Sequence, residues 1–202
     1  MHPSVVLDQG GDILELGAGC GLVGLTAAAL LRQYQQQKEQ GHEQNEPKSK
    51  GGHEEKEIRN VIFTDYNATA CENLQRNAHL NDLDTCTSVV GLDFFDQSEN
   101  ESNCNPHASS DTWIDMQGNQ RPQVSLILAA DIICYSNDAS LVANTIQAAL
   151  LEGGQAIVIG PHENHRFGIQ YFPDACRSVG LKVHLTNIIV ADELCKSNGS
   201  NM

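Results

Sequence analysis

The feature that most constrains this chain is an apolar run that leads into three alternating glycines near its amino end. The segment Asp12–Leu16 is followed directly by Gly17-Ala18-Gly19-Cys20-Gly21, and apolar residues then recur at helical spacing over Leu22–Tyr34. A buried strand that turns through glycines into a helix is the first half of a βαβ unit. Such units build a parallel sheet with helices on both faces.

The rest of the chain repeats this alternation of apolar β-branched runs and amphipathic runs. We expect strands at Asp12–Leu16, Asn60–Thr64, Thr87–Leu92, Val124–Ala129, Gln155–Gly160 and Leu181–Val190, and helices at about Leu22–Tyr34, Ala68–Asn81, Ser140–Leu151 and Gly168–Val179. The predicted fold is α/β: a doubly wound, mostly parallel Rossmann-like sheet of about six strands with helices on both faces.

One domain is predicted over residues 1–202. Two polar stretches, residues 33–57 and 97–122, interrupt the pattern, and we expect both to be disordered surface insertions. The only tryptophan, Trp113, falls in the second stretch. It is expected to be exposed there, where it could fold over the site as a lid.

Composition and charge exclude several kinds of function. The net charge of −14 would repel nucleic acid and attract a basic partner, unless the acidic surface is simply solvated. The seven cysteines include no C-x-x-C pair, which argues against a disulfide framework or a zinc knuckle. His162-Glu163-Asn164-His165 lacks a third metal ligand at a recognisable spacing, so we interpret it as a polar loop. With no secretory leader or apolar span, we expect a monomer in the cytoplasm or nucleus that binds neither membranes nor metal.

The glycine loop suits an anionic ligand. Glycine lets a ligand approach the backbone, and the amides and dipole of the next helix favour negative charge. Gly19-x-Gly21-x-x-Gly24 also satisfies the dinucleotide pattern, so a nicotinamide-dependent dehydrogenase is kept as the last-ranked alternative. A tight turn that only packs a helix on the sheet is another.

An acid two residues before the first glycine favours S-adenosylmethionine, which presents a carboxylate and an ammonium group. The pattern Ile13-Leu14-Glu15-x-Gly17-x-Gly19-x-Gly21 resembles the first motif of class I, S-adenosylmethionine-dependent methyltransferases. The cofactor contacts predicted from this segment are Glu15, Gly17, Ala18, Gly19 and Gly21.

Two further strands end on acidic residues. Asp65, followed by Tyr66, is placed to accept both ribose hydroxyls of an adenosine, although it could instead only cap the following helix. Asp93 could accept a hydrogen bond from the adenine amino group while Phe94 packs on the ring face. Alternatively, Phe94 and Phe95 simply anchor a loop in the core.

The fourth strand delivers Ala130 and Asp131 to the same sheet edge, where ligands bind in open α/β folds. A lysine amine, whose ordinary pKa is about 10.4, must be neutral to accept a methyl group, and a neighbouring sulfonium lowers that pKa. A carboxylate such as Asp131 would position the amine and complement its developing charge. Asp131 is thus the leading catalytic candidate, with Tyr135 beside it and Ala130 as a cofactor contact. The alternative is that Asp131 caps the helix from Ser136.

Taken together, Leu14–Leu25 and the Asp65, Asp93 and Asp131 segments resemble methyltransferase family 16. This group is similar to the chaperone, elongation-factor and calmodulin lysine methyltransferases. The resemblance implies S-adenosyl-L-methionine as methyl donor and a protein side chain, usually lysine, as acceptor.

The chain departs from the family pattern in three places. Family members have Asp-x-x-Tyr at the fourth strand, whereas here Cys134 takes the tyrosine position and Tyr135 follows it. They also carry a tryptophan-bearing helix before the first strand, so either this chain is truncated or its cofactor pocket is more open. The polar tail after Leu194 implies an incomplete final hairpin.

These observations predict a methyltransferase that modifies protein lysine. The shifted tyrosine leaves open a small molecule or another side chain as acceptor. The absent front helix leaves open a non-catalytic module that binds the cofactor or a protein partner.

Overall fold

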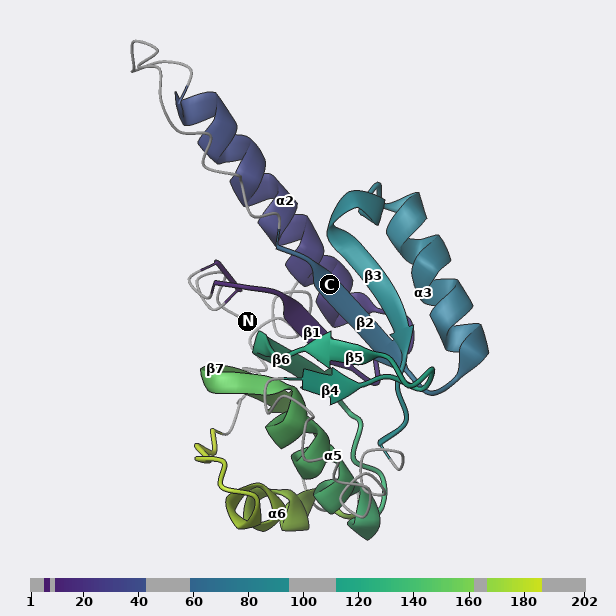
Figure 1. Ribbon diagram of the computed structural model, residues 1–202, viewed down its shortest axis with the longest axis vertical. Coiled ribbons are helices and arrows are strands. Elements are labelled where there is room, and N and C mark those ends of the chain that lie inside the picture. The colour runs from purple at the N-terminus through teal and green to yellow at the C-terminus, as the bar shows by residue number, and fades with distance from the viewer. Residues whose placement is uncertain (1–5, 8–9, 43–58, 95–111, 162–166, 187–202) are drawn as a thin grey trace, which may run out of the picture.

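A five-stranded parallel sheet forms the centre of the molecule (Figure 1). The computed structural model describes residues 6–7, 10–42, 59–94, 112–161 and 167–186. Within these ranges the strand order is β3-β2-β1-β6-β7, and every neighbouring pair is parallel. The strands are β1 (Ile13–Leu16), β2 (Val61–Asp65), β3 (Thr87–Gly91), β6 (Val124–Ala130) and β7 (Leu150–Ile159). The strand order reverses between β1 and β6, and this switch point is where open α/β sheets bind ligands.

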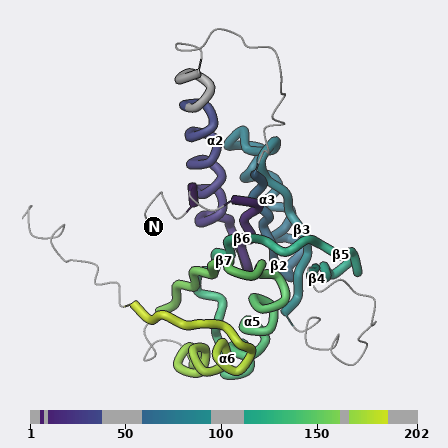
Figure 2. The backbone as a smooth tube through the Cα atoms, turned by 60° about the vertical axis from the view of Figure 1, so that its left-hand side comes forward, coloured from purple at the N-terminus to yellow at the C-terminus, as the bar shows by residue number. Residues whose placement is uncertain are grey.

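Helices cover both faces of this sheet (Figures 1 and 2). The elements outside the sheet are α2 (Leu22–His42), α3 (Ala68–Leu80), α5 (Ser136–Ala149), α6 (Phe172–Ser178), and the 3₁₀ turns η1 (Asp84–Cys86) and η3 (Ile169–Tyr171). Ile13 of β1 packs in one core cluster with Ala28 of α2, whereas its neighbour Leu14 packs in a second cluster with Val142 of α5. The central strands are therefore buried on both faces, and the predicted doubly wound fold is confirmed.

The first polar stretch differs from the prediction at its start. Helix α2 was expected to end near Tyr34, but it continues to His42, inside the stretch 33–57. Gln, Glu and Lys dominate this part of the helix and are good helix formers even when exposed. Figure 1 shows the helix projecting beyond the sheet. Residues 43–58 lie outside the described ranges.

The second polar stretch holds an ordered hairpin, which corrects the prediction for its last residues. Strands β4 (Thr112–Ile114) and β5 (Gln120–Pro122) pair antiparallel. Trp113 is only 2% exposed, belongs to the core cluster that includes α5, and donates from Nε1 to the Pro122 carbonyl oxygen at 2.8 Å. The expected exposed tryptophan lid is therefore wrong. Residues 95–111 lie outside the described ranges.

The sixth predicted strand, Leu181–Val190, is not formed over residues 181–186, the part of it that the structure describes. Leu181 instead closes the end of α6, where its amide donates to the Cys176 carbonyl oxygen at 3.0 Å. The sheet thus has five strands in the described ranges, with β7 at one end. No helix in these ranges has the length and apolar character needed to cross a membrane.

Candidate active site

The glycine loop after β1 adopts a left-handed conformation, which favours glycine, at three positions. Gly17, Gly19 and Gly21 have φ values of +57°, +55° and +82°. A Cβ on Gly17 would lie 2.7 Å from Cγ2 of Ile132, and one on Gly21 would lie 2.6 Å from Cδ2 of Leu74. A Cβ on Gly19 would meet no described atom within 4 Å. Gly19 is therefore the point at which this loop leaves room for a ligand.

Glu15 is bonded to the start of α2, the helix that follows the loop. Its carboxylate is buried and accepts a hydrogen bond from the Gly24 amide at 3.0 Å, within the first turn of α2. Burial raises the pKa of Glu15 to about 7, although hydrogen bonds from the Gly24 and Val23 amides act in the opposite direction. Glu15 thus binds the Gly24 and Val23 amides at the start of α2, where an anionic ligand was expected. Its predicted contact with the cofactor stays a prediction.

Asp65, the last residue of β2, joins the loop to the neighbouring strand. Its carboxylate accepts hydrogen bonds from the Gly19 amide and from the Asn67 amide, each at 2.9 Å. Asn67 is the N-cap of α3, because its side chain accepts from the Thr69 and Ala70 amides. The alternative in which Asp65 caps that helix is therefore wrong.

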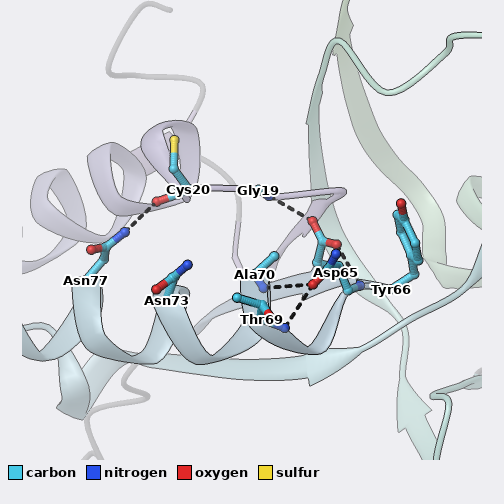
Figure 3. Close-up of a pocket in the computed structure, with 9 residues that line it drawn as sticks. Gly19, Cys20, Asp65, Tyr66, Thr69, Ala70, Asn73 and Asn77 are labelled. Carbon is cyan, nitrogen blue, oxygen red and sulfur yellow. Dashed lines mark hydrogen bonds between the residues drawn. The ribbon is translucent and has the colours of Figure 1, made fainter.

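A cavity of about 560 Å³ lies between the glycine loop, the end of β2 and α3 (Figure 3). It is within the usual size range of small-molecule sites. Its lining residues are small or polar: Gly19, Cys20, Asp65, Tyr66, Asn67, Thr69, Ala70, Asn73 and Asn77. Asn77 donates to the Cys20 carbonyl oxygen at 3.0 Å and so ties α3 to the loop. Tyr66 lies on the other side of Asp65 from Asn73 and Asn77.

The chemistry of this cavity fits the ribose of an adenosine. A carboxylate has about four acceptor positions, and the two backbone amides use two of those on Asp65. Asp65 remains 8% exposed and lines the cavity, so the other two positions can receive a pair of hydroxyl donors. Of the predicted contacts, the structure therefore brings Gly19, Asp65 and Tyr66 to one cavity.

Two other predicted segments meet at Gly17, the first residue of the loop. Cζ of Phe94 lies 3.9 Å from a Cβ placed on Gly17, where Ile132 also packs. Asp93 is one residue earlier, and the Leu92 amide donates to the Asp65 carbonyl oxygen at 3.1 Å. The ends of β1, β2, β3 and β6 therefore converge at the glycine loop.

Asp131 follows β6 in a left-handed conformation, with φ of +55°. It is one of two non-glycine residues with positive φ in the described ranges, and such residues cluster at functional sites. Ala130, the last residue of β6, is half-buried beside it. The N-cap residue of α5 is Tyr135, not Asp131, and Asp138 accepts from the Cys134 and Tyr135 amides at 2.8 Å each.

Tyr135 precedes α5 and is 72% exposed, whereas Cys134 is half-buried. The catalytic role of Tyr135 stays a prediction. Three asparagines that line the cavity, Asn67, Asn73 and Asn77, were not predicted from the sequence. Asn73 and Asn77 are four residues apart on α3 and therefore share a face, which is the signal that could have identified them. In the described ranges no group of three His, Cys, Asp or Glu side chains could hold a metal ion.

The amino-terminal part of the chain is similar to one known family. Residues 6–40 match the model of the Methyltransf_16 family, described as lysine methyltransferase. This segment contains β1, the glycine loop and most of α2. No curated protein sequence matches the chain.

Solved structures share the fold at low sequence identity. An O-methyltransferase family protein from Burkholderia thailandensis has a TM-score of 0.55 and 12% identity, over 91% of this chain and 49% of that one. Precorrin 8w decarboxylase from Methanobacterium thermoautotrophicum has a TM-score of 0.52 and 14% identity, over 91% of this chain and 71% of that one. A TehB-like SAM-dependent methyltransferase from Corynebacterium glutamicum has a TM-score of 0.50 and 16% identity, over 90% of this chain and 73% of that one. The chain thus spans about half to three quarters of these proteins.

Proposed function

We propose that the chain is a class I, S-adenosylmethionine-dependent methyltransferase that methylates lysine side chains of a protein. Its fold and its matched amino-terminal segment support this proposal. The observation that carries the proposal is Asp65, whose carboxylate is bonded to the Gly19 amide and lines the cavity. The lysine acceptor is supported by the description of the matched family and by Asp131 at the end of β6. The net charge of −14 favours a basic partner.

In this proposal each group of residues has a separate task. The Asp65 carboxylate binds the ribose hydroxyls, and the open backbone at Gly19 lets the ligand approach. Asp131 holds the acceptor amine and stabilises the positive charge that develops on its nitrogen. The bound cofactor supplies an electrophilic methyl group on a positively charged sulfur. Transfer of this methyl group to the amine nitrogen would yield S-adenosylhomocysteine, and the methylated amine would release a proton to solvent.

A small-molecule acceptor is the second candidate. It is favoured by the exposed Tyr135, which follows the position where the related family has its tyrosine. The names of the fold neighbours, an O-methyltransferase family protein and a precorrin decarboxylase, are consistent with small-molecule chemistry on this fold. A location in the cytoplasm or nucleus and a monomeric state stay predictions.

The first test is calorimetric titration of the full chain with S-adenosylhomocysteine and, separately, with NAD. We expect micromolar binding of S-adenosylhomocysteine that is lost in Asp65→Ala. Asp84→Ala, which removes an exposed carboxylate of η1, is the matched control and should bind like the wild type. Thermal melting of each variant separates lost binding from lost folding. NAD binding without S-adenosylhomocysteine binding would overturn the cofactor assignment.

The second test identifies the acceptor. The chain is incubated with tritiated S-adenosylmethionine and either protein extract or a protein-free small-molecule fraction. Label in protein that hydrolysis recovers as methyl-lysine supports the proposal. Label found only in the small-molecule fraction supports the second candidate. Cofactor binding without any transfer supports a non-catalytic binding module.

A further inference from the structure

The turn of the β4–β5 hairpin lies against the carboxyl end of β3. The Met116 amide donates to the Gly91 carbonyl oxygen at 3.0 Å. A Cβ on Gly91 would lie 3.2 Å from Nε2 of Gln117 and 3.3 Å from Sδ of Met116. Both backbone views place the hairpin beside this end of β3 (Figures 1 and 2). Gly91 is the register partner of Asp65, so the turn stands next to the strand end that faces the cavity.

This turn is held rigidly for a surface hairpin. The Asp115 carboxylate is fully buried and accepts from the Gln117 and Asn119 amides, from Asn119 Nδ2 and from two nitrogens of Arg121, at 2.8–3.0 Å. Burial raises the pKa of Asp115, but the hydrogen bonds from Asn119 and the Arg121 charge outweigh this and lower it below its usual range. The buried Trp113 anchors the adjoining strand. Hydrogen bonds to Gly91 and to Asp115 therefore hold the backbones of Met116 and Gln117.

The two side chains that this turn presents suit a purine ring. Met116 and Gln117 are both exposed, and they stand beside Gly91, two residues before Asp93. A thioether packs favourably against aromatic rings. A glutamine amide offers a donor and an acceptor together, the pattern that matches the amino group and N7 of adenine.

We propose that the β4–β5 turn forms one wall of the adenine site, with Met116 against the ring and Gln117 hydrogen-bonded to its edge. The inference rests on the proposed function, since it assumes that S-adenosylmethionine binds with its ribose at Asp65. The hairpin then contributes to cofactor selectivity, because the Gln117 side-chain amide accepts a hydrogen bond from the adenine amino group. A side chain at Gly91 would press on the ends of the Met116 and Gln117 side chains and shift them by a few tenths of an ångström.

The test is calorimetric titration of the full chain with S-adenosylhomocysteine and with S-inosylhomocysteine, in which oxygen replaces the adenine amino group. We expect Gln117→Ala to weaken S-adenosylhomocysteine binding about tenfold, the effect of one hydrogen-bonding side chain. It should also reduce the preference for S-adenosylhomocysteine over the inosine analogue. Met116→Ala should weaken both ligands by a similar factor. Gln120→Ala, an exposed glutamine in the same hairpin, is the matched control.

The ratio of the two affinities separates a direct contact from a general loosening of the fold, which would weaken both ligands equally. If the wild type binds S-adenosylhomocysteine but Gln117→Ala and Met116→Ala both bind it as Gln120→Ala does, the inference is overturned and the proposed function stands. If the wild type binds neither ligand, the proposed function fails, and the inference fails with it. An unchanged melting temperature in each variant confirms that the fold is intact.

Discussion

Replacing Glu15 by Gln should change how the stability of the protein depends on pH. The Glu15 carboxyl is 3% exposed, and burial raises its pKa from 4.5 to about 7. The folded protein therefore keeps a proton that the unfolded chain releases between these two values. As a result, the free energy of unfolding falls as the pH rises through this window. The full loss is on the order of 3 kcal/mol, from about 1.4 kcal/mol for each pKa unit.

The assay is urea unfolding followed by the fluorescence of Trp113, the only tryptophan, which is buried. The pH should run from about 5.5 to 8.5, because near the pI of about 4.8 the protein carries little net charge and tends to associate. Within this range Glu15 accounts for about 2 kcal/mol of the loss. Gln has no proton to release, so Glu15→Gln lacks this loss. Between pH 5.5 and pH 8.5 its free energy of unfolding should therefore rise by about 2 kcal/mol relative to that of the wild type.

Glu72→Gln, which neutralises an exposed carboxylate on α3, is the matched control for lost surface charge. Its stability should follow the wild-type curve. Parallel curves for the wild type and Glu15→Gln across the whole range would refute the reasoning, because they would mean that Glu15 does not titrate differently in the folded and unfolded states.

Three further outcomes are expected. Gly24→Ala should lower the free energy of unfolding by about 2 kcal/mol in the same assay, since its methyl group would collide with Glu15 and the Phe63 ring. Arg32→Ala should cost about 1 kcal/mol, because Arg32 donates to two carbonyl groups just after α3; an unchanged urea midpoint would contradict this. Asp131→Asn should slow transfer of the tritiated methyl group about 100-fold while leaving S-adenosylhomocysteine affinity within about twofold of the wild type, and a parallel loss of affinity would assign Asp131 to cofactor binding instead.

The sequence predicted best what depends on local pattern. The strand, glycine loop and helix around Gly17 follow from neighbouring residues, and the five strands of the sheet were each identified from a short apolar run. The sequence could not show which side chains reach which amides. Asp65 and Asn67 both lie before α3, and only the three-dimensional path of the chain makes Asn67 the cap.

The second polar stretch was misinterpreted for a related reason. Its composition is typical of disorder, yet Trp113 is buried by packing near α5, which lies more than twenty residues later in the chain. The burial of this large aromatic side chain and the Asp115–Arg121 pair both stabilise the short hairpin. Neither long-range packing nor a partly buried ion pair leaves a periodic signal in the sequence.

The three glycines of the loop do not carry equal evidence for a ligand. Gly17 is required by the nearby side chain of Ile132 and Gly21 by that of Leu74, so packing alone explains both. Gly19 has a positive φ and open space above it, and its amide is held by Asp65. Since packing accounts for the other two glycines, the evidence for ligand binding is concentrated at Gly19 and Asp65. A chain with the same motif but with atoms packed against Gly19 would match the pattern equally well. Its cavity, however, could not be reached from the loop.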